Sequence, residues 1–266
     1  MVFINRSVTE ISEVDYPMVQ NGGYYAPENC RSRHKVAIIV PYRNRKENLA
    51  VFITSMHPFL MKQKLEYRIF IVEQKGTELF NRGRLFNAGY LEVRKYGNWK
   101  CVVFHDVDLL PLDERILYSC PLWPRHMCGT VVEVKNPSFR TLFGGVSAMI
   151  PQHFEKVNGF SNVYWGWGGE DNDLFWRIRA VGLPIVRYNK LIAKYTSLQH
   201  EKSKPNTLRY NLLQGFARRF LRDGLTTLEY VVDKVILHHL YTHLMLDLNP
   251  RKINITKMML EASRWK

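Results

Sequence analysis

Short apolar runs alternate with longer amphipathic segments over the first 110 residues. Runs rich in Val, Ile and Phe occupy 36–45, 67–74 and 101–110, and each predicts a buried strand. Apolar residues recur at helical spacing over 46–63 and 83–97, which predicts two helices between these strands. This alternation is typical of βαβ units. It predicts an α/β fold with a Rossmann-like, mainly parallel sheet.

The pattern becomes irregular after about residue 120. Glycines dominate the stretch WGWGG, and a helix is predicted from Glu170 to Ala180, where Gly182 closes it. Short strands are expected at 128–134, 143–150, 184–196, 228–235 and 241–248. We therefore predict an extended lead-in over 1–34, one α/β domain with an elaborated second half over 35–250, and a tail over 251–266.

Composition narrows the class of partner. The 266 residues are 46% hydrophobic and carry a net charge of +14, which favours nucleic acids, anionic membranes or phosphate-bearing small molecules. No zinc-finger spacing or RNA-binding aromatic motif is present, so we expect no nucleic-acid partner. No apolar run reaches the roughly 18 residues that span a bilayer. The protein is then either cytosolic or the soluble part of a longer, anchored chain.

Two aspartates follow the third predicted strand in FHDVDLLP (104–111). Asp106 and Asp108 are alternate residues, so both carboxylates could face one site at the carboxyl end of the sheet. Such a pair would need a cation, and hard oxygen ligands suit Mn²⁺ or Mg²⁺. The alternative is that both residues only cap the strand and form its turn.

Basic residues stand at the ends of the other two strands. Arg43 and Arg45 follow the first in PYRNR, and FNRGR places Phe80 and Arg82 after the second. Guanidinium groups match phosphate oxygens, and a phenyl ring offers a stacking face for a base. These arginines could also be ordinary solvated side chains.

Six motifs, in this order, make a resemblance specific: PYRNRKENL, FNRGRLFNAGY, FHDVDLLP, FGGVSAM, NGFSNVYWGWGGED and LQHEKSKPN. Together they resemble the β-1,4-galactosyltransferase family of Golgi enzymes, which includes invertebrate β-1,4-N-acetylgalactosaminyltransferases. The resemblance covers roughly residues 25–250. It implies a GT-A type catalytic domain that uses a UDP-sugar with Mn²⁺ and inverts the anomeric centre.

The resemblance also implies a nucleotide site and a metal site. The residues expected at the nucleotide are Pro41, Arg43, Arg45, Phe80, Arg82, Asp106, Val107 and Trp167. Asp108 and His200 match the family's carboxylate and histidine metal ligands. Ser197 stands where many members have a methionine ligand. A hydroxyl is harder than a thioether, which leaves metal preference and affinity open.

Donor and acceptor residues follow from the same motifs. Leu142 stands before FGG, where members that transfer galactose have a tyrosine, and its smaller side chain leaves room for an N-acetyl group. The alternative is that Leu142 is a core residue and the donor is UDP-galactose. The residues expected at a terminal GlcNAc acceptor are Gly145, Tyr164, Trp167, Gly168, Asp171, Arg209, Tyr210 and Leu213.

The resemblance assigns Asp171 as the general base, with Glu170 and Asn172 beside it. Typical members read Glu-Asp-Asp-Asp here, so Asn172 replaces a carboxylate. A slow enzyme, a changed acceptor, or an inactive relative that still binds glycan or UDP are therefore alternatives. The resemblance also implies a Cys101–Cys120 disulfide, leaves Cys30 and Cys128 paired or free, and predicts a Golgi-luminal domain whose N-terminal type II anchor is absent from this chain.

Overall fold

Three parallel strands form the centre of the main sheet, and each stands where an apolar run predicts it. The computed structural model describes residues 2, 4–5, 7–12, 16–134, 141–201 and 203–264. The strands are β2 (Lys35–Tyr42), β3 (Glu66–Gln74) and β4 (Cys101–His105), and β2 pairs in parallel with both others. The crossovers are α1 (Lys46–Lys62) and α2 (Arg82–Val93), the latter followed by the 3-10 helix η1 (Arg94–Tyr96). The predicted βαβ units are confirmed.

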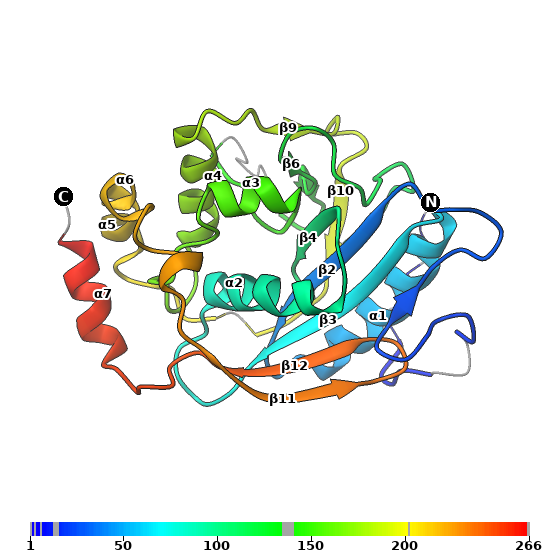
Figure 1. Cartoon of the computed structure of the whole chain (residues 1–266), viewed down its shortest axis with the longest axis horizontal. Helices are drawn as coiled ribbons and strands as arrows, with labels where there is room; N and C mark the ends of the chain where they lie inside the picture. The colour runs from blue at the N-terminus through cyan, green and yellow to red at the C-terminus, as the bar shows by residue number, and fades with distance from the viewer. Residues whose placement is uncertain are drawn as a thin grey trace.

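The complete sheet is mixed, with antiparallel strands towards its edges (Figure 1). Its order is β11-β12-β3-β2-β4-β8-β6-β9, and β1 lies beside β3. The added strands are β1 (Tyr24–Tyr25), β6 (Arg125–His126), β8 (Val146–Met149), β9 (Val186–Arg187), β11 (Val231–Leu237) and β12 (Thr242–Asp247). The sheet is parallel from β12 to β4, whereas β8 and β11 run antiparallel to their neighbours. The predicted parallel order therefore holds for the centre.

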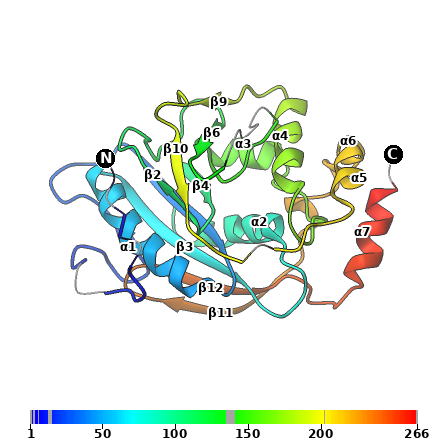
Figure 2. The same cartoon turned by 180° about the vertical axis from the view of Figure 1, so that it is seen from behind.

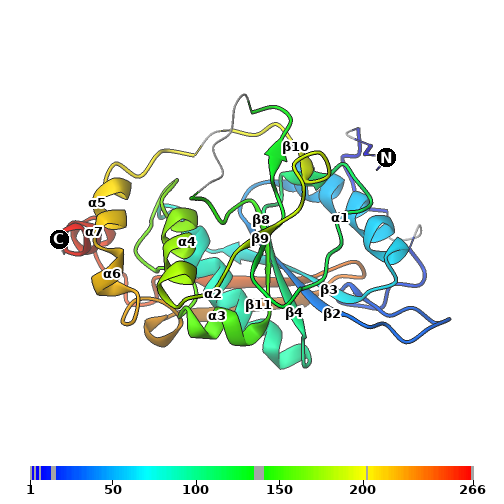
Figure 3. The same cartoon turned by 90° about the horizontal axis from the view of Figure 1, so that it is seen from above.

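Two hydrophobic cores lie on opposite faces of this sheet. Val36 and Ile38 pack in the core that includes α1, while Ala37 and Ile39 pack in the core that includes α2. The views in Figure 2 and Figure 3 show α1 and α2 on opposite sides of the sheet. Burial on both faces explains why β2 is a continuous apolar run rather than an alternating one.

A second, three-stranded sheet begins directly after β4. Its strand β5 (Leu109–Pro111) pairs antiparallel with β10 (Lys194–Ser197), and β10 pairs in parallel with β7 (Thr130–Val131). The strand expected over 101–110 is therefore two strands that belong to different sheets. The break falls at the acidic residues, which places them at the junction of the two sheets.

The second half contains short helices that the sequence pattern did not reveal. They are α3 (Pro151–Lys156), α5 (Arg209–Gln214), α6 (Phe216–Arg219), α7 (Ile255–Ser263) and the 3-10 helix η2 (Leu225–Thr227). The predicted helix α4 (Glu170–Ala180) is present and packs against α6, while α5 packs against α7. Helices of three to six residues are too short to show a clear helical period, which explains why α3, α5, α6 and η2 were missed. The apolar residues of α7 do recur at helical spacing, so this helix had a usable signal in the sequence.

The chain ends differ from the expected lead-in and tail. Val19 and Tyr25 are buried in the core beside β3, and α7 buries Met259. Residues 1, 3, 6, 13–15 and 265–266 of these two segments lie outside the described residues. Among the described helices, none combines the length and the apolar character that crossing a membrane requires.

Candidate active site

The carboxyl ends of β2, β3 and β4 open onto one cavity of about 820 Å³. Every residue predicted for the nucleotide lines it: Pro41, Arg43, Arg45, Phe80, Arg82, Asp106, Val107 and Trp167. The expected catalytic residues Glu170 and Asp171 and the expected metal ligands Asp108 and His200 line it too. The edge of a parallel sheet thus brings together basic, aromatic and acidic groups from distant parts of the chain.

Arg82 lies at the centre of the acidic cluster. Its Nε donates to Oδ1 of Asp106 at 2.6 Å, and its Nη1 donates to Oδ1 of Asp171 at 2.5 Å. Nη1 also lies 3.4 Å from Oε1 of Glu170. Asp106 follows β4, while the other two carboxylates belong to the first turn of α4. One guanidinium therefore joins the sheet to this helix.

Burial controls the charge state of this cluster. Burial raises the pKa of Asp106 to about 7, against the lowering effect of Arg82, and the nearby Asp108 and Asp171 raise it further. Burial likewise raises the pKa of Glu170 to about 7, with Asp171 adding to the effect and Arg82 opposing it. Burial alone would lower the pKa of Arg82, but the three carboxylates raise it above its usual value. The cluster has more carboxylates than cationic partners, which suits a site that receives further positive charge.

Asp108 and His200 contact each other directly in the cavity. His200 Nδ1 lies 2.7 Å from the Glu201 carbonyl, which only accepts hydrogen bonds, so Nδ1 carries the proton. In the neutral ring Nε2 is then an acceptor, yet it lies 2.8 Å from Oδ2 of Asp108. At this distance the two groups form an ion pair if the imidazole is protonated, and in its neutral form Nε2 is free to bind a metal ion beside the carboxylate. Ser197 Oγ lies 3.5 Å from the same Oδ2.

The donor set of Asp108, His200 and Ser197 is one carboxylate, one imidazole and one hydroxyl. Hard oxygen and imidazole ligands fit Mn²⁺, so the residues present are compatible with the predicted ion. Among the described residues, no three His, Cys, Asp or Glu side chains gather into a metal-binding group. Pairing of β10 with β5 places Ser197 opposite Leu109, directly after Asp108, which explains how two distant segments meet.

The glycine-rich loop before α4 forms one wall of the cavity. Gly166, Gly168 and Gly169 have φ values of +84°, +99° and +106°, a region that other residues rarely adopt. Between them the side chain of Trp167 is 59% exposed, while its backbone N–H donates to the Lys204 carbonyl at 3.0 Å. The glycines therefore allow a backbone conformation in which the Trp167 ring lines the cavity and stays exposed to solvent.

The two glycines of FGG, Gly144 and Gly145, lie beside Asp171 and Asp106. A Cβ on Gly144 would lie 1.9 Å from Oδ2 of Asp171, so a side chain there would displace this carboxylate. Gly145 has a φ of +68°, and its carbonyl accepts a hydrogen bond from the Asp106 amide at 3.0 Å. The sequence prediction included Gly145 but missed Gly144, although the Gly-Gly pair was a usable signal.

Several of the predicted acceptor residues lie together beside the glycine-rich loop. Arg209 lies over the rings of Trp167 and Tyr210, at 5.6 and 4.6 Å from their centroids, and Tyr210 is 65% exposed. Gly168 lies beside Arg209, since a Cβ there would stand 3.1 Å from its Cδ. Leu213 is half-buried on α5. Trp167, Arg209 and Tyr210 thus form a surface next to the loop, and their role as an acceptor site stays a prediction.

Tyr164 and Asn172 are placed differently from the prediction. Tyr164 is 1% exposed and its hydroxyl donates to Oδ2 of Asp173 at 3.0 Å, so in this conformation it supports α4 and is closed to a sugar. Asn172 Nδ2 donates to the Thr141 carbonyl at 2.6 Å rather than joining the acid cluster. Leu142 is half-buried and lies outside the lining of the cavity.

Comparisons with known proteins decide the family. Residues 2–121 match the family described as the N-terminal region of glycosyl transferase group 7, and residues 126–201 match the one described as the N-terminal domain of galactosyltransferase. The chain is 41% identical to mouse (Mus musculus) β-1,4-galactosyltransferase 4 over 254 residues, 93% of this chain and 73% of the relative. The rat (Rattus norvegicus) β-1,4-galactosyltransferase 6 is 40% identical, over 93% of this chain and 67% of the relative. The chain belongs to the β-1,4-galactosyltransferase family.

A solved structure of a family member agrees with the fold. The catalytic domain of Drosophila β-1,4-galactosyltransferase 7, complexed with xylobiose, has a TM-score of 0.71 and 29% identity, over 85% of this chain and 97% of that one. A mutant of the same enzyme was solved with manganese, UDP-Gal and xylobiose, at the same similarity. The α/β architecture is therefore of the GT-A type, and the protein is a glycosyltransferase.

In this galactosyltransferase-family chain, a buried ionic network holds α4 in place. Asp173 and Arg177 are fully buried and paired one turn apart on the helix. Arg177 also contacts Oδ2 of Asp223, and Arg219 contacts Asp173 at 3.4 Å. The i, i+4 spacing of Asp173 and Arg177 was the signal in the sequence. Breaking such a buried pair is strongly destabilising, so the network fixes the helix that presents the acid cluster.

Sequence reasoning also missed residues that lie between the predicted ones. Further residues line the cavity: Tyr42, Asn44, Lys46, Glu47, Asn48, Gly166, Gln199, Glu201 and Ser203. Arg45 Nη2 donates to the Glu201 carbonyl at 2.8 Å, and Asn48 Nδ2 donates to the Gln199 carbonyl at 3.3 Å. These bonds attach the start of α1 to the segment that carries His200.

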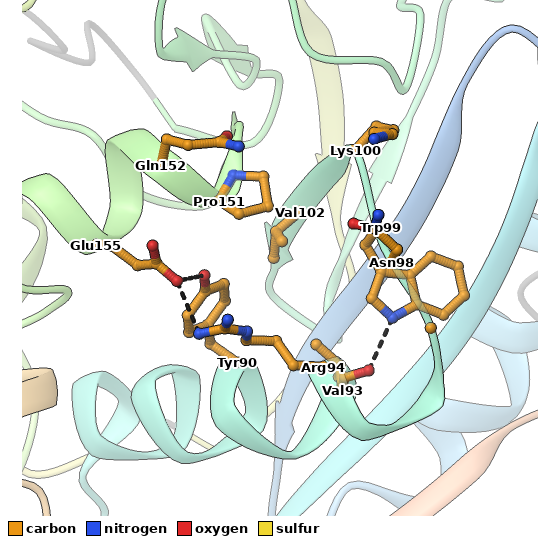
Figure 4. A pocket seen from close by; sticks show the side chains of 11 residues that line it. Tyr90, Val93, Arg94, Asn98, Trp99, Lys100, Val102, Pro151, Gln152 and Glu155 are labelled. Carbon is orange, nitrogen blue, oxygen red and sulfur yellow. Dashed lines mark hydrogen bonds and ion pairs between the residues drawn. The ribbon is translucent and has the colours of Figure 1, made fainter.

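A smaller pocket of about 360 Å³ lies at the end of α2, where α3 faces it (Figure 4). Glu155 accepts hydrogen bonds from Tyr90 at 2.7 Å and from Arg94 at 2.8 Å, and the Trp99 indole donates to the Val93 carbonyl. The polar groups of Tyr90, Arg94, Trp99 and Glu155 thus have hydrogen-bond partners within the protein. None of the predicted site residues lines this pocket.

The cysteines follow the family expectation where it was specific. Cys101 and Cys120 form the predicted disulfide, with Cα atoms 5.3 Å apart. Cys30 is an exposed free thiol and Cys128 a buried one, which settles the alternative left open by the sequence. Burial raises the pKa of Cys128 well above its usual value, so its thiol stays neutral.

Proposed function

We propose that this enzyme transfers GalNAc from UDP-GalNAc to the 4-hydroxyl of a terminal β-linked GlcNAc, with inversion at the anomeric carbon. One observation carries the proposal: the Asp108–His200 pair, Arg82 and Asp171 all face one cavity of about 820 Å³. The cavity is large enough for a nucleotide sugar. A nucleotide-sugar transferase needs a phosphate site, a cation site and a base within reach of one another.

The nucleotide end of the cavity is built by β2 and the start of α2. Arg43 lies over the Phe80 ring at 5.2 Å from its centroid, and its Nη1 donates to the Glu78 carbonyl at 2.8 Å. This stacking holds a planar cation beside a planar apolar face, an arrangement suited to a base and its phosphates. Arg45, on the same loop, supplies further positive charge. The chemistry that Mn²⁺ supplies, when held by Asp108, His200 and Ser197, is neutralisation of the departing diphosphate.

Asp171 is the general base of the proposal. It accepts the proton of the acceptor 4-hydroxyl as that oxygen attacks C1 of the donor sugar and the bond from C1 to the diphosphate breaks. Arg82 holds the carboxylate in place through Nη1, and Gly144 leaves room for it. Asn172 donates to Thr141 instead of joining the cluster. The departure from Glu-Asp-Asp-Asp therefore leaves the base untouched, which argues against an inactive relative.

The acceptor side is proposed to be the surface of Trp167, Arg209 and Tyr210. Aromatic rings pack against the apolar face of a pyranose, and an arginine can donate to its hydroxyl or amide oxygens. The glycines around Trp167 would let this loop move over the bound donor and exclude water. We further propose a place in the Golgi lumen through an N-terminal type II anchor. The disulfide agrees with an oxidising compartment.

The donor is the finer part of the proposal and rests on Leu142. Galactose is the second candidate, because the relatives carry the name of galactosyltransferases and the Drosophila complex holds UDP-Gal. Turnover of UDP-GalNAc and UDP-Gal with one GlcNAc acceptor separates the two. We expect UDP-GalNAc to be preferred, and Leu142→Tyr to shift the ratio towards UDP-Gal by about tenfold or more. A wild-type enzyme that prefers UDP-Gal would contradict the donor assignment.

A further inference from the structure

Asn172 makes a hydrogen bond that a carboxylate in its place could not make. It is the third residue of α4, directly after Asp171. Its Nδ2 lies 2.6 Å from the carbonyl oxygen of Thr141, 31 residues earlier in the chain. A carbonyl oxygen only accepts, so the amide nitrogen must face it and donate. The aspartate of the typical family pattern has no proton to donate at neutral pH.

The bond acts on the segment that carries the proposed donor-selecting residue. Thr141 is followed by Leu142, whose own carbonyl accepts a hydrogen bond from Arg187 Nη2 at 3.2 Å. The next amide, that of Phe143, donates to the Asp171 carbonyl at 3.3 Å. Three consecutive residues are thus attached to neighbouring elements through their backbone. Two of the three attachments lead to the first turn of α4, which also presents the proposed base.

We propose that Asn172 is a positioning residue for donor selection. Its bond fixes the backbone of Thr141 and thereby the position of the next residue, Leu142. Leu142 is half-buried outside the lining of the cavity, and the proposed function brings it to the 2-substituent of the donor sugar. This inference rests on the proposed function, because it needs Leu142 at the donor. It does not depend on which of the two sugars is preferred, because it concerns the size of the ratio between the kcat/KM values for the two UDP-sugars.

Asn172→Asp is the informative variant. It removes the donated hydrogen bond and places a carboxylate against the Thr141 carbonyl. Acidic residues are favourable in the first turn of a helix, so α4 is expected to stay folded. Asn172→Ser shortens the side chain, so that the hydrogen bond to Thr141 is lost without an added charge. Asn98→Asp is the matched control, because it makes the same chemical change at an exposed residue away from the site.

The experiment compares wild type and the three variants in two measurements. One is kcat/KM for UDP-GalNAc and for UDP-Gal with one GlcNAc acceptor. The other is calorimetric binding of UDP, UDP-GalNAc and UDP-Gal in the presence of Mn²⁺. We expect Asn172→Asp to change the ratio between the two sugars by about threefold to tenfold, while binding of UDP itself stays within twofold. Asn172→Ser should change the ratio less, and Asn98→Asp should keep it.

An unchanged ratio in Asn172→Asp would overturn the inference. So would an equal loss of binding for UDP and both sugars, because that would show a general disturbance of the site. A wild-type preference for UDP-Gal would contradict the proposed donor alone, and the ratio in the variants would still judge the role of Asn172. If the wild type transferred neither sugar, the binding ratio of the two UDP-sugars would decide in the same way.

Discussion

The carboxylate of Asp171 occupies the space that a side chain on Gly144 would need. A Cβ atom there would lie 1.9 Å from Oδ2 of Asp171, and 2.7 Å from its Oδ1. Gly144 lies two residues before β8 and Asp171 lies in the first turn of α4, so the two segments approach closely at the proposed catalytic base. The absence of a side chain at Gly144 is therefore part of the proposed catalytic geometry.

Gly144→Ala should reduce turnover by about 100-fold or more, because displacement of a catalytic group by about 1 Å has an effect of this size. UDP binding should persist, since the nucleotide residues lie on other elements. Steady-state kinetics and calorimetry measure both.

Gly182→Ala is the contrasting control for this variant. Gly182 follows α4 with a φ of +76°, and a Cβ there would meet nothing within 4 Å. The strain of that backbone should lower the free energy of unfolding by about 1 kcal/mol with turnover unchanged. Equal kinetic losses in the two variants would contradict the role given to Gly144.

Ser197 offers a test of the metal site. Ser197→Met restores the thioether that many family members have, and a softer ligand should favour Mn²⁺ over Mg²⁺. We expect the ratio of Mn²⁺ to Mg²⁺ affinity, measured by competition with electron paramagnetic resonance of Mn²⁺, to rise by about tenfold. Asp108→Ala should abolish specific Mn²⁺ binding. If Ser197→Met left the ratio as in wild type, Ser197 would have no place among the ligands.

The central strands and the site edge could be predicted from the sequence, for a physical reason. Strands buried on both faces are continuous apolar runs, and parallel strands send their polar ends to one edge. The positions of Arg43, Phe80 and Asp106 followed from that rule alone. Residues with chemistry specific to the family, such as His200, needed the resemblance, because a single histidine in a loop has no pattern of its own.

The errors came from residues whose role depends on tertiary contacts. Tyr164 was expected at the acceptor sugar, but it is buried and its hydroxyl donates to Asp173 of α4. Asn172 was expected beside the proposed base, but its amide nitrogen donates to the Thr141 carbonyl. Neighbours in space that are distant in sequence decide the direction of such side chains. Short helices such as α5 and α6 were missed because four to six residues show no clear period.

His57 predicts how stability depends on pH. Burial lowers its pKa from 6.5 to about 4, and its ring nitrogens bond to the Tyr67 hydroxyl and the Leu240 carbonyl. Between pH 6.5 and 4 the unfolded chain binds a proton that the folded chain excludes, so stability falls as pH falls. Relative to His57→Gln, the wild type should lose up to about 1.4 kcal/mol of unfolding free energy per pH unit in this range. If the difference in unfolding free energy between the wild type and His57→Gln stayed the same at all pH values, the prediction would be wrong.

The central claim is that Asp171 acts as the base of a UDP-sugar transfer in the cavity at the sheet edge. The most direct test is UDP release by Asp171→Asn, with GlcNAc as acceptor and Mn²⁺ present, together with calorimetric UDP binding. The account predicts that turnover falls by about 100-fold or more while UDP binding stays within a few-fold of wild type. Turnover close to that of the wild type would contradict it.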